Sequence, residues 1–165
     1  MKSAVRGGQK SKSASEKAVL DEMDRKILRA LTDDGRVSFR DLGERIHMSA
    51  NATAERVRRL CEERVICGFH ACIDLARTGT PLEAYVDIRL QAGTSAEDFE
   101  ALARKVPGVM TLAVVTGDFD CRVRVACSDQ ADLMRLIEAL RAGGGIQGTN
   151  TSVICREFDV KNRIF

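Results

Sequence analysis

The amino-acid sequence predicts an α+β fold in two parts, a helical N-terminal part and a C-terminal part in which strands and helices alternate. Apolar residues recur at helical spacing from Leu20 to Cys61, whereas a two-residue alternation dominates several segments after Ala84. The 165 residues, 44% of them hydrophobic and 30% charged, suit a globular chain with one medium core or two small ones.

Composition excludes a membrane-spanning or secreted chain. No apolar run approaches the roughly 20 residues that span a bilayer, and no signal peptide is present, so we expect a cytoplasmic protein. Residues 1–18 are rich in Ser, Lys and Gly and predict a flexible basic arm, which either touches phosphate or is a leader without a role. Because the basic excess lies in this arm, bulk charge supports nucleic-acid binding only weakly.

Three short helices are predicted in residues 19–64. The apolar stripe of the first consists of Met23, Ile27, Leu28 and Leu31. Ser38 and Asp41 form a capping box for the second, whose apolar face holds Phe39, Leu42 and Ile46. Ser49 caps the third, whose core stripe holds Ala50, Thr53, Ala54, Val57, Leu60 and Cys61. With the brief turn His47-Met48 between the last two helices, the segment predicts a helix-turn-helix.

The third helix carries a polar face opposite Val57, formed by Asn51, Ala52, Glu55, Arg58 and Arg59. Asn can pair with adenine, Arg with guanine and Glu with cytosine, at about 1–3 kcal/mol of base discrimination per contact. Asn51 and Glu55 lie near the helix start, where base readers are expected. The alternatives are an ordinary solvated helix surface and a module that binds proteins.

Arg56 lies at the flank of this face, where it could touch phosphate or brace the helix through Glu63 or Asp41, and we favour bracing. The predicted DNA-binding residues are Ser38, Ser49, Ala50, Asn51, Ala52, Glu55, Arg56, Arg58 and Arg59.

Residues 65–81 are predicted as a wing strand over VICGFHACID followed by a hinge at Thr78–Pro81. Residues 82–160 then show the order βαββαβ of a ferredoxin-like domain. The predicted strands are 84–90, 109–116, 121–127 and 149–156; helices follow Ser95 and contain Leu133 to Leu140. The run Gly143-Gly144-Gly145 ends the second helix.

The sequence holds no recognisable catalytic arrangement, and we expect neither enzymatic activity nor a cofactor or metal. His47 and His70 have no cysteine or carboxylate at metal-ligand spacing. The six cysteines include no C-x-x-C pair and are interpreted as small reduced hydrophobes, with Cys121 and Cys127 in step with a strand. Redox sensing by one of them stays open.

The chain resembles the Lrp/AsnC family of bacterial and archaeal regulators over residues 19–160. The matching stretches are LDEMDRKILRALTDDGRVSFRDLGERIHMS, RVRRL, VICGFHACID, VVTGDFD and TNTSVI. The resemblance implies a winged helix-turn-helix reader and a domain that dimerises through its sheet. It further implies assembly into octamers or similar discs, with an amino acid or related metabolite bound between dimers. Two positions depart from the family pattern, Arg64 in place of a glycine and Thr53 in place of a branched aliphatic.

The turn Gly117-Asp118-Phe119-Asp120 holds two carboxylates, which either serve a plain β-turn or bind a ligand. The resemblance places this turn, with Thr149 and Thr151, at the effector pocket. Asp118 and Asp120 would accept hydrogen bonds from an amino group, and the threonine hydroxyls or backbone amides would hold a carboxylate.

The function expected is a sequence-specific, ligand-modulated transcriptional regulator that binds double-stranded DNA as a homo-oligomer. The alternative is a ferredoxin-like small-molecule enzyme or carrier with an accessory helical domain, against which the lack of a nucleophile and base argues.

Overall fold

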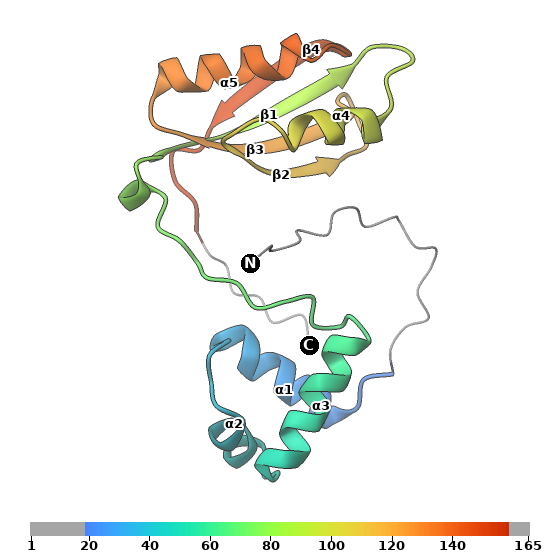
Figure 1. Cartoon of the computed structure of the whole chain (residues 1–165), viewed down its shortest axis with the longest axis vertical. Coiled ribbons are helices and arrows are strands. Elements are labelled where there is room, and N and C mark those ends of the chain that lie inside the picture. Colours follow the sequence, from blue (N-terminus) through green and yellow to red (C-terminus); the bar gives the residue numbers. More distant parts are fainter. Residues whose placement is uncertain (1–18, 159–165) are drawn as a thin grey trace, which may run out of the picture. The chain divides into compact units, whose positions relative to one another are not determined.

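The computed structural model describes residues 19–158. These fall into two compact units, residues 19–71 and residues 72–158 (Figure 1). The predicted basic arm, residues 1–18, lies outside the described residues.

The first unit is a three-helix domain with α1 at Glu22–Asp33, α2 at Phe39–Ile46 and α3 at Ala50–Glu62 (Figure 1). Each helix begins after the residue that caps it: the side chains of Asp21, Ser38 and Ser49 each accept the backbone N–H of the third residue of the helix. The buried core consists of Ile27, Leu28, Leu42, Ile46, Val57 and Leu60. The helix-turn-helix prediction is confirmed.

Three residues predicted to face this core do not. Phe39, the first residue of α2, is 46% exposed. Ala50 and Cys61 are also exposed, and they lie near the two ends of α3, where the apolar stripe runs out. Helical periodicity identifies a face, but it does not say how far along the helix the packing partners reach.

The turn between α2 and α3 is tight enough to need a glycine. His47 ends α2 in the left-handed conformation (φ 59°). A Cβ on Gly43 would lie 2.6 Å from the carbonyl oxygen of Met48 and 3.0 Å from Oγ1 of Thr53. Thr53 is fully buried, and its hydroxyl donates a hydrogen bond to the carbonyl of Ser49 (2.9 Å). Threonine in place of the family's branched aliphatic residue therefore leaves no buried polar group unsatisfied.

The predicted wing strand is absent: residues 65–74 form no strand in the described structure. Instead, the backbone N–H groups of Val65 and Ile66 both donate to the carbonyl of Leu60, which closes α3. A strand needs a hydrogen-bonded neighbour, and this segment has none within residues 19–158. Its alternating apolar side chains Phe69 and Ile73 are therefore more than half exposed, at 53% and 56%. A short 3₁₀ turn, Ala76–Thr78, follows.

The second unit is a four-stranded antiparallel sheet with two helices, in the order β1 (Leu82–Leu90), α4 (Ala96–Ala103), β2 (Val109–Val114), β3 (Cys121–Cys127), α5 (Gln130–Ala142) and β4 (Ile146–Val153) (Figure 1). The strand order β2-β3-β1-β4 is the ferredoxin-like arrangement, as predicted. Both helices pack on one face, where the core includes Val86, Ile88, Phe99, Val123, Leu136 and Leu140.

Strand β4 begins three residues earlier than predicted and ends three residues earlier. Its register against β1, from Ile146 opposite Leu90 to Val153 opposite Ala84, sets both ends. Glycines mask the start of this strand in the sequence, because they carry no alternating pattern. The shift does not change the face of Thr149 and Thr151, which pair with the core-facing Ile88 and Val86.

Candidate nucleic-acid interface and ligand pocket

One face of α3 is free to meet a partner. Asn51, Ala52, Glu55 and Arg58 are all exposed, and they lie opposite the buried Thr53, Val57 and Leu60. Within this face, Arg58 donates to the carboxylate of Glu55 at 2.6 Å, one helical turn away. The cap residues Ser38 and Ser49 and the first residue, Ala50, are also exposed, at the N-terminal ends of α2 and α3. The face combines both hydrogen-bond donors and acceptors.

Arg59 does not belong to this face, and the helical-wheel placement of its side chain opposite the core is wrong. Its guanidinium donates to both carboxylate oxygens of Asp24 on α1, at 2.7 Å each. The side chain of Asp24 is only 1% exposed, so the pair holds Arg59 against the body of the domain. A second contact, 3.7 Å from the carboxylate of Glu63, holds Arg59 along its own helix.

Arg56 braces the helix, but through other partners than those predicted. It donates to Asp21 at 2.5 Å and to Asp24 at 2.9 Å, whereas Glu63 and Asp41 were the expected partners. The sequence could not show this pairing, because α1 and α3 meet more than thirty residues apart in the chain.

Four side chains form the ion-pair cluster between α1 and α3 and stabilise one another in the charged form: Asp21, Asp24, Arg56 and Arg59. Burial works to raise the pKa of Asp24, but hydrogen bonds from Arg59, from the backbone of Asp21 and from Arg56 outweigh it and lower the pKa. The hydrogen bond from the backbone of Asp24, followed by that from Arg56, lowers the pKa of Asp21. A buried charge is tolerated when partners satisfy it in this way, so Asp24 fixes α3 on α1.

In the second unit, the turn that follows β2 packs against the end of β1. The backbone N–H of Asp120 donates to the carbonyl of Ile88 (2.9 Å), and Oδ2 of Asp120 accepts the N–H of Leu90 (2.7 Å). Arg89 donates to the carbonyl of Asp118 (3.0 and 2.7 Å) and lies over the ring of Phe119, 5.5 Å from its centre. Gly117 adopts a φ of 119°, which other residues rarely adopt. The turn is thus held in place by β1.

A cavity of about 410 Å³ opens beside this turn. Its wall is formed by the end of β1, the loop that follows it, the start of α4 and the end of β2, namely Leu90, Gln91, Ala92, Gly93, Thr94, Ala96, Val114, Val115 and Asp120. Of the predicted effector residues, only Asp120 lines it. The loop 91–94 was not among the predicted site residues, because its only signal in the sequence is a polar connection between a strand and a capped helix.

Thr149 and Thr151 are not brought to this cavity within the chain. They lie on β4, on the other side of β1 from β3, and the hydroxyl of Thr149 accepts a hydrogen bond from Arg141 of α5. The carboxylate of Asp118, in contrast, is exposed and makes no hydrogen bond or ion pair within the described part of the chain.

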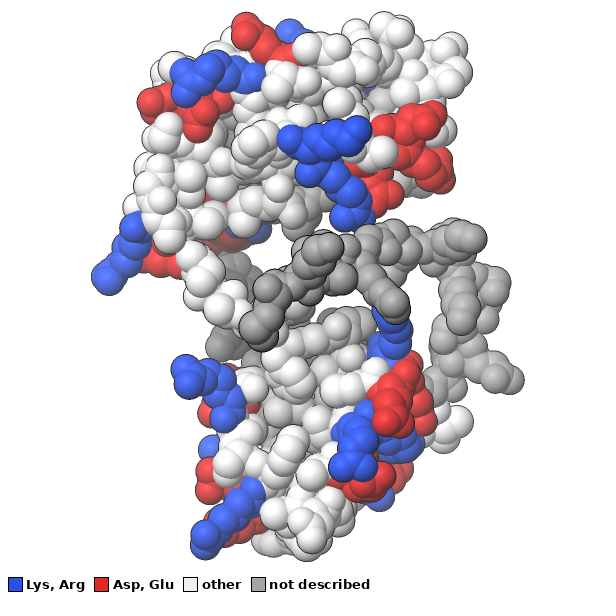
Figure 2. Space-filling model, in the orientation of Figure 1, with Lys and Arg blue, Asp and Glu red and all other residues white. Residues whose placement is uncertain are grey.

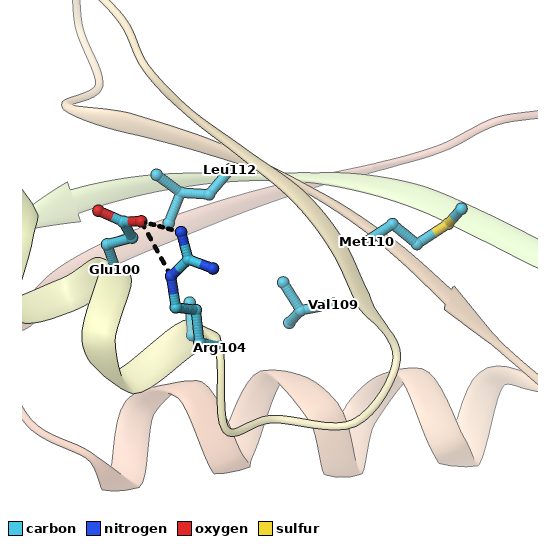
Figure 3. A pocket seen from close by; sticks show the side chains of 6 residues that line it. Glu100, Arg104, Val109, Met110 and Leu112 are labelled. Atoms are coloured by element: carbon cyan, nitrogen blue, oxygen red, sulfur yellow. Dashed lines mark hydrogen bonds and ion pairs between the residues drawn. The ribbon is translucent and has the colours of Figure 1, made fainter. Parts of the chain in front are cut away.

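A second cavity, of about 330 Å³, lies between α4 and β2 (Figure 3). Arg104 and Glu100 face each other across one helical turn at its rim, with Arg104 Nε 2.9 Å from Glu100 Oε1. Val109 and Leu112 supply apolar wall. Because the two charges satisfy each other, this cavity offers a ligand no free charged group, and we regard the cavity beside Asp120 as the better candidate.

Charge does not mark out a single binding surface. Figure 2 shows basic and acidic side chains interspersed over the visible face of both units. Among residues 19–158, no cluster of His, Cys, Asp and Glu is arranged to hold a metal ion. The described helices are too short or too polar for any of them to cross a membrane.

Comparison with known proteins identifies both units. Residues 20–60 match the AsnC-type helix-turn-helix domain, and residues 83–164 match the Lrp/AsnC ligand binding domain. The chain is 42% identical to the Bkd operon transcriptional regulator of Pseudomonas aeruginosa, over 69% of this chain and 76% of that protein. It is 38% identical to the transcriptional regulator AldR of Mycolicibacterium smegmatis, over 82% and 81%.

Solved structures of the same fold include complexes with an amino acid. One is a feast or famine regulatory protein of Mycobacterium tuberculosis with L-methionine, with a TM-score of 0.82 and 27% identity over 87% of this chain and 99% of that chain. Another is a transcriptional regulator of Neisseria meningitidis with L-methionine, with a TM-score of 0.80 and 25% identity over 87% and 94%.

Proposed function

The chain belongs to the Lrp/AsnC family of transcriptional regulators, and from this premise we propose that α3 reads DNA sequence while the second unit binds an amino acid that tunes DNA binding. The observation that carries the first half is the polar face of α3, exposed while the rest of the helix is held on α1 and α2. The enzyme or carrier alternative is disfavoured, since the relatives are named as transcriptional regulators.

Base reading falls to Asn51, Glu55 and Arg58, with Ala52 allowing close approach. Ser38, Ser49 and Ala50 lie at helix N-termini, whose N–H groups and positive dipole end suit phosphate contacts. Arg56 and Arg59 hold α3 at the angle at which its face meets the groove. Arg59, which the sequence predicted to contact DNA, therefore has the same positioning role as Arg56 and does not contact bases.

Fluorescence anisotropy with labelled DNA from upstream of the chain's own gene tests this assignment. Asn51→Ala is expected to cost about 1–3 kcal/mol on that fragment and much less on unrelated DNA. Arg135→Ala, an exposed arginine on α5, is the matched control. If Asn51→Ala binds both DNAs as the unchanged protein does, α3 does not read sequence through this face.

The effector is proposed to lie in the cavity beside Asp120. One oxygen of Asp120 already accepts the N–H of Leu90, which leaves the other to accept an ammonium group. The carboxylate of Asp118 does not line the cavity, but it belongs to the same turn and has no partner within the described chain, so we propose it as a second acceptor at the edge of the site. Gly117 and Phe119 shape this turn. Thr94 brings a hydroxyl to the cavity, and it is better placed there than Thr149 or Thr151 to hold a carboxylate. Apolar wall from Leu90, Ala92 and Val114 favours an amino acid with an apolar side chain.

A thermal-shift screen over the amino acids tests effector binding, because a ligand of the native state raises the unfolding midpoint by mass action. An apolar amino acid that raises the midpoint in a concentration-dependent way is expected. No shift with any amino acid at millimolar concentration contradicts the proposal.

Assembly is proposed to use the sheet face that α4 and α5 leave uncovered. There Arg122 pairs with Asp87 at 2.6 Å and Arg124 with Glu83 at 2.6 Å, so charges on this face are already neutralised and can be buried against a second copy. We propose a dimer through this face and higher assembly to an octamer, acting in the cytoplasm on the chromosome. Sedimentation velocity tests this, and a monomer at micromolar concentration overturns it.

A further inference from the structure

Two cysteines lie together at the end of the proposed reading helix. Cys61, in the last turn of α3, and Cys67, which follows the helix, are both exposed free thiols and both line one hollow of about 320 Å³. The Sγ of Cys67 donates to the carbonyl of Arg64 at 3.5 Å. Neither thiol contributes to the core of the first unit. Their position is explained neither by packing nor by the DNA-reading face.

The other cysteines make a useful contrast. Cys121 and Cys127 are buried in β3, and burial raises the pKa of both thiols, which suits inert structural residues. Cys61 and Cys67 are open to solvent, and Arg64 lines the hollow that they share. Oxidation-sensitive cysteines are accessible, lie in electropositive surroundings and have a second thiol beside them.

We propose that Cys61 and Cys67 are a modification site at which a hydroperoxide forms an intramolecular disulfide that weakens DNA binding. The weakening rests on the proposed function, whereas the disulfide does not. One thiolate attacks the peroxide, the O–O bond breaks, and a sulfenic acid and an alcohol or water are formed. The second thiol then displaces the hydroxyl as water, so that two thiols lose two electrons and two protons to one peroxide.

The reason for weaker DNA binding lies in the geometry of the helix end. Cys67 must move from the carbonyl of Arg64 towards Cys61 to reach the S–S distance of about 2.05 Å. The segment between them closes α3 through hydrogen bonds from Arg64 to Cys61 (3.1 Å) and from Val65 to Leu60 (2.9 Å). A disulfide therefore distorts the last turn of α3, next to Arg58 and Arg59.

Peptide mapping tests the disulfide without any DNA. After hydrogen peroxide and capping of the remaining thiols, trypsin is expected to release residues 60–64 linked to residues 65–77, with fragmentation placing the bond at Cys67 and not Cys72. Cys155→Ser, at an exposed cysteine outside the hollow, keeps the link, whereas Cys61→Ser and Cys67→Ser lose it. Free thiols at both positions, a bond to Cys72, or a bond between two chains overturns the proposal.

Anisotropy on the upstream DNA tests the consequence. Peroxide is expected to weaken binding by the unchanged protein roughly tenfold, about the value of one good base contact, and a thiol reductant should restore it. Cys61→Ser should bind equally before and after peroxide. A cross-linked protein with unchanged affinity overturns the regulatory half. If the reduced protein fails to bind, the proposed function fails, and the peptide map still decides the disulfide.

Discussion

Asp24 is a carboxylate buried in the first unit, with the guanidinium groups of two arginines of α3 around it. Its neighbours in sequence gave no sign of this role, because a capping residue on α1 and two charges on α3 meet only after the helices have packed. Periodicity placed Arg56 at the flank of the core stripe and Arg59 on the opposite face, and it could not show that one carboxylate lies within reach of both. Long-range polar contacts are of this kind, and they decide which arginines remain available to DNA.

The lowered pKa of Asp24 leads to a pH dependence of stability. A carboxyl whose folded pKa is lowered contributes stability that is complete above its ordinary pKa of 3.8 and is lost as pH falls through the folded value. Asp24→Asn removes this contribution, so we expect a loss of about 3 kcal/mol at neutral pH, typical of a broken buried pair, that shrinks as the pH approaches the acid range.

Urea unfolding at a series of pH values measures this difference. Glu22→Gln is the matched control, since that carboxylate is exposed and pairs with Lys26 at the surface, where such pairs contribute little. Asp21 also has a lowered pKa and is present in all three proteins. A gap between the unchanged protein and Asp24→Asn that stays constant with pH would show that the pair does not set the acid response.

Among the helices and strands, the two-residue alternation of apolar side chains predicted β3 correctly and the wing strand wrongly. Both outcomes depend on whether a partner strand exists. Cys121, Val123 and Val125 alternate and find partners on β1 and β2, whereas Phe69, Ala71 and Ile73 alternate without a neighbouring strand in the described chain. Alternation records which side chains can share a face. It does not record whether a partner strand exists, and so the sequence predicted the strand order of the second unit but not the fate of residues 65–74.

The end of α3 gives a second prediction. Arg64 adopts a φ of 56°, and its N–H and that of Val65 close the helix on Cys61 and Leu60, a geometry that glycine adopts without cost. Arg64→Gly is therefore expected to stabilise the protein by about 1 kcal/mol. The substitution removes the cost of a non-glycine residue in the left-handed conformation, and part of this gain is offset because glycine makes the unfolded chain more flexible. Urea unfolding measures it.

Arg64→Ala is the matched control, because it removes the same side chain but keeps a Cβ in the left-handed region. It should not stabilise. Equal effects of the two substitutions would mean that the side chain of Arg64, and not its backbone, sets the stability of this helix end.

Across the two units, sequence and resemblance predicted a helix-turn-helix followed by a ferredoxin-like domain, and both are confirmed. The prediction of the effector site is less complete. The carboxylates of the turn 117–120 were recognisable from composition, but the loop 91–94 is not, because only the pairing of β3 with β1 brings Asp120 beside the end of β1 and the loop that follows it. A ligand pocket shared by separate loops has no local signature in the sequence.

The two carboxylates of the turn are not equivalent in the structure, and this decides which one tests the effector site. Asp120 holds the end of β1 through Leu90, so its removal would disturb the sheet as well as a ligand. Asp118 is held by its backbone carbonyl through Arg89, while its carboxylate is free of hydrogen bonds and ion pairs within the described chain. Asp118→Ala should therefore keep the turn, the fold and basal DNA binding.

What Asp118→Ala should lose is the response to the effector, because a charge-assisted contact with the ammonium group disappears. Since a ligand shifts an assembly only by its difference in affinity between states, sedimentation and DNA-binding titrations should both lose their dependence on the amino acid found in the thermal-shift screen. Glu97→Ala, an exposed carboxylate on α4 and outside the turn 117–120, is the matched control and should respond fully. If Asp118→Ala responds with unchanged midpoints in both titrations, the ligand binds elsewhere on the chain.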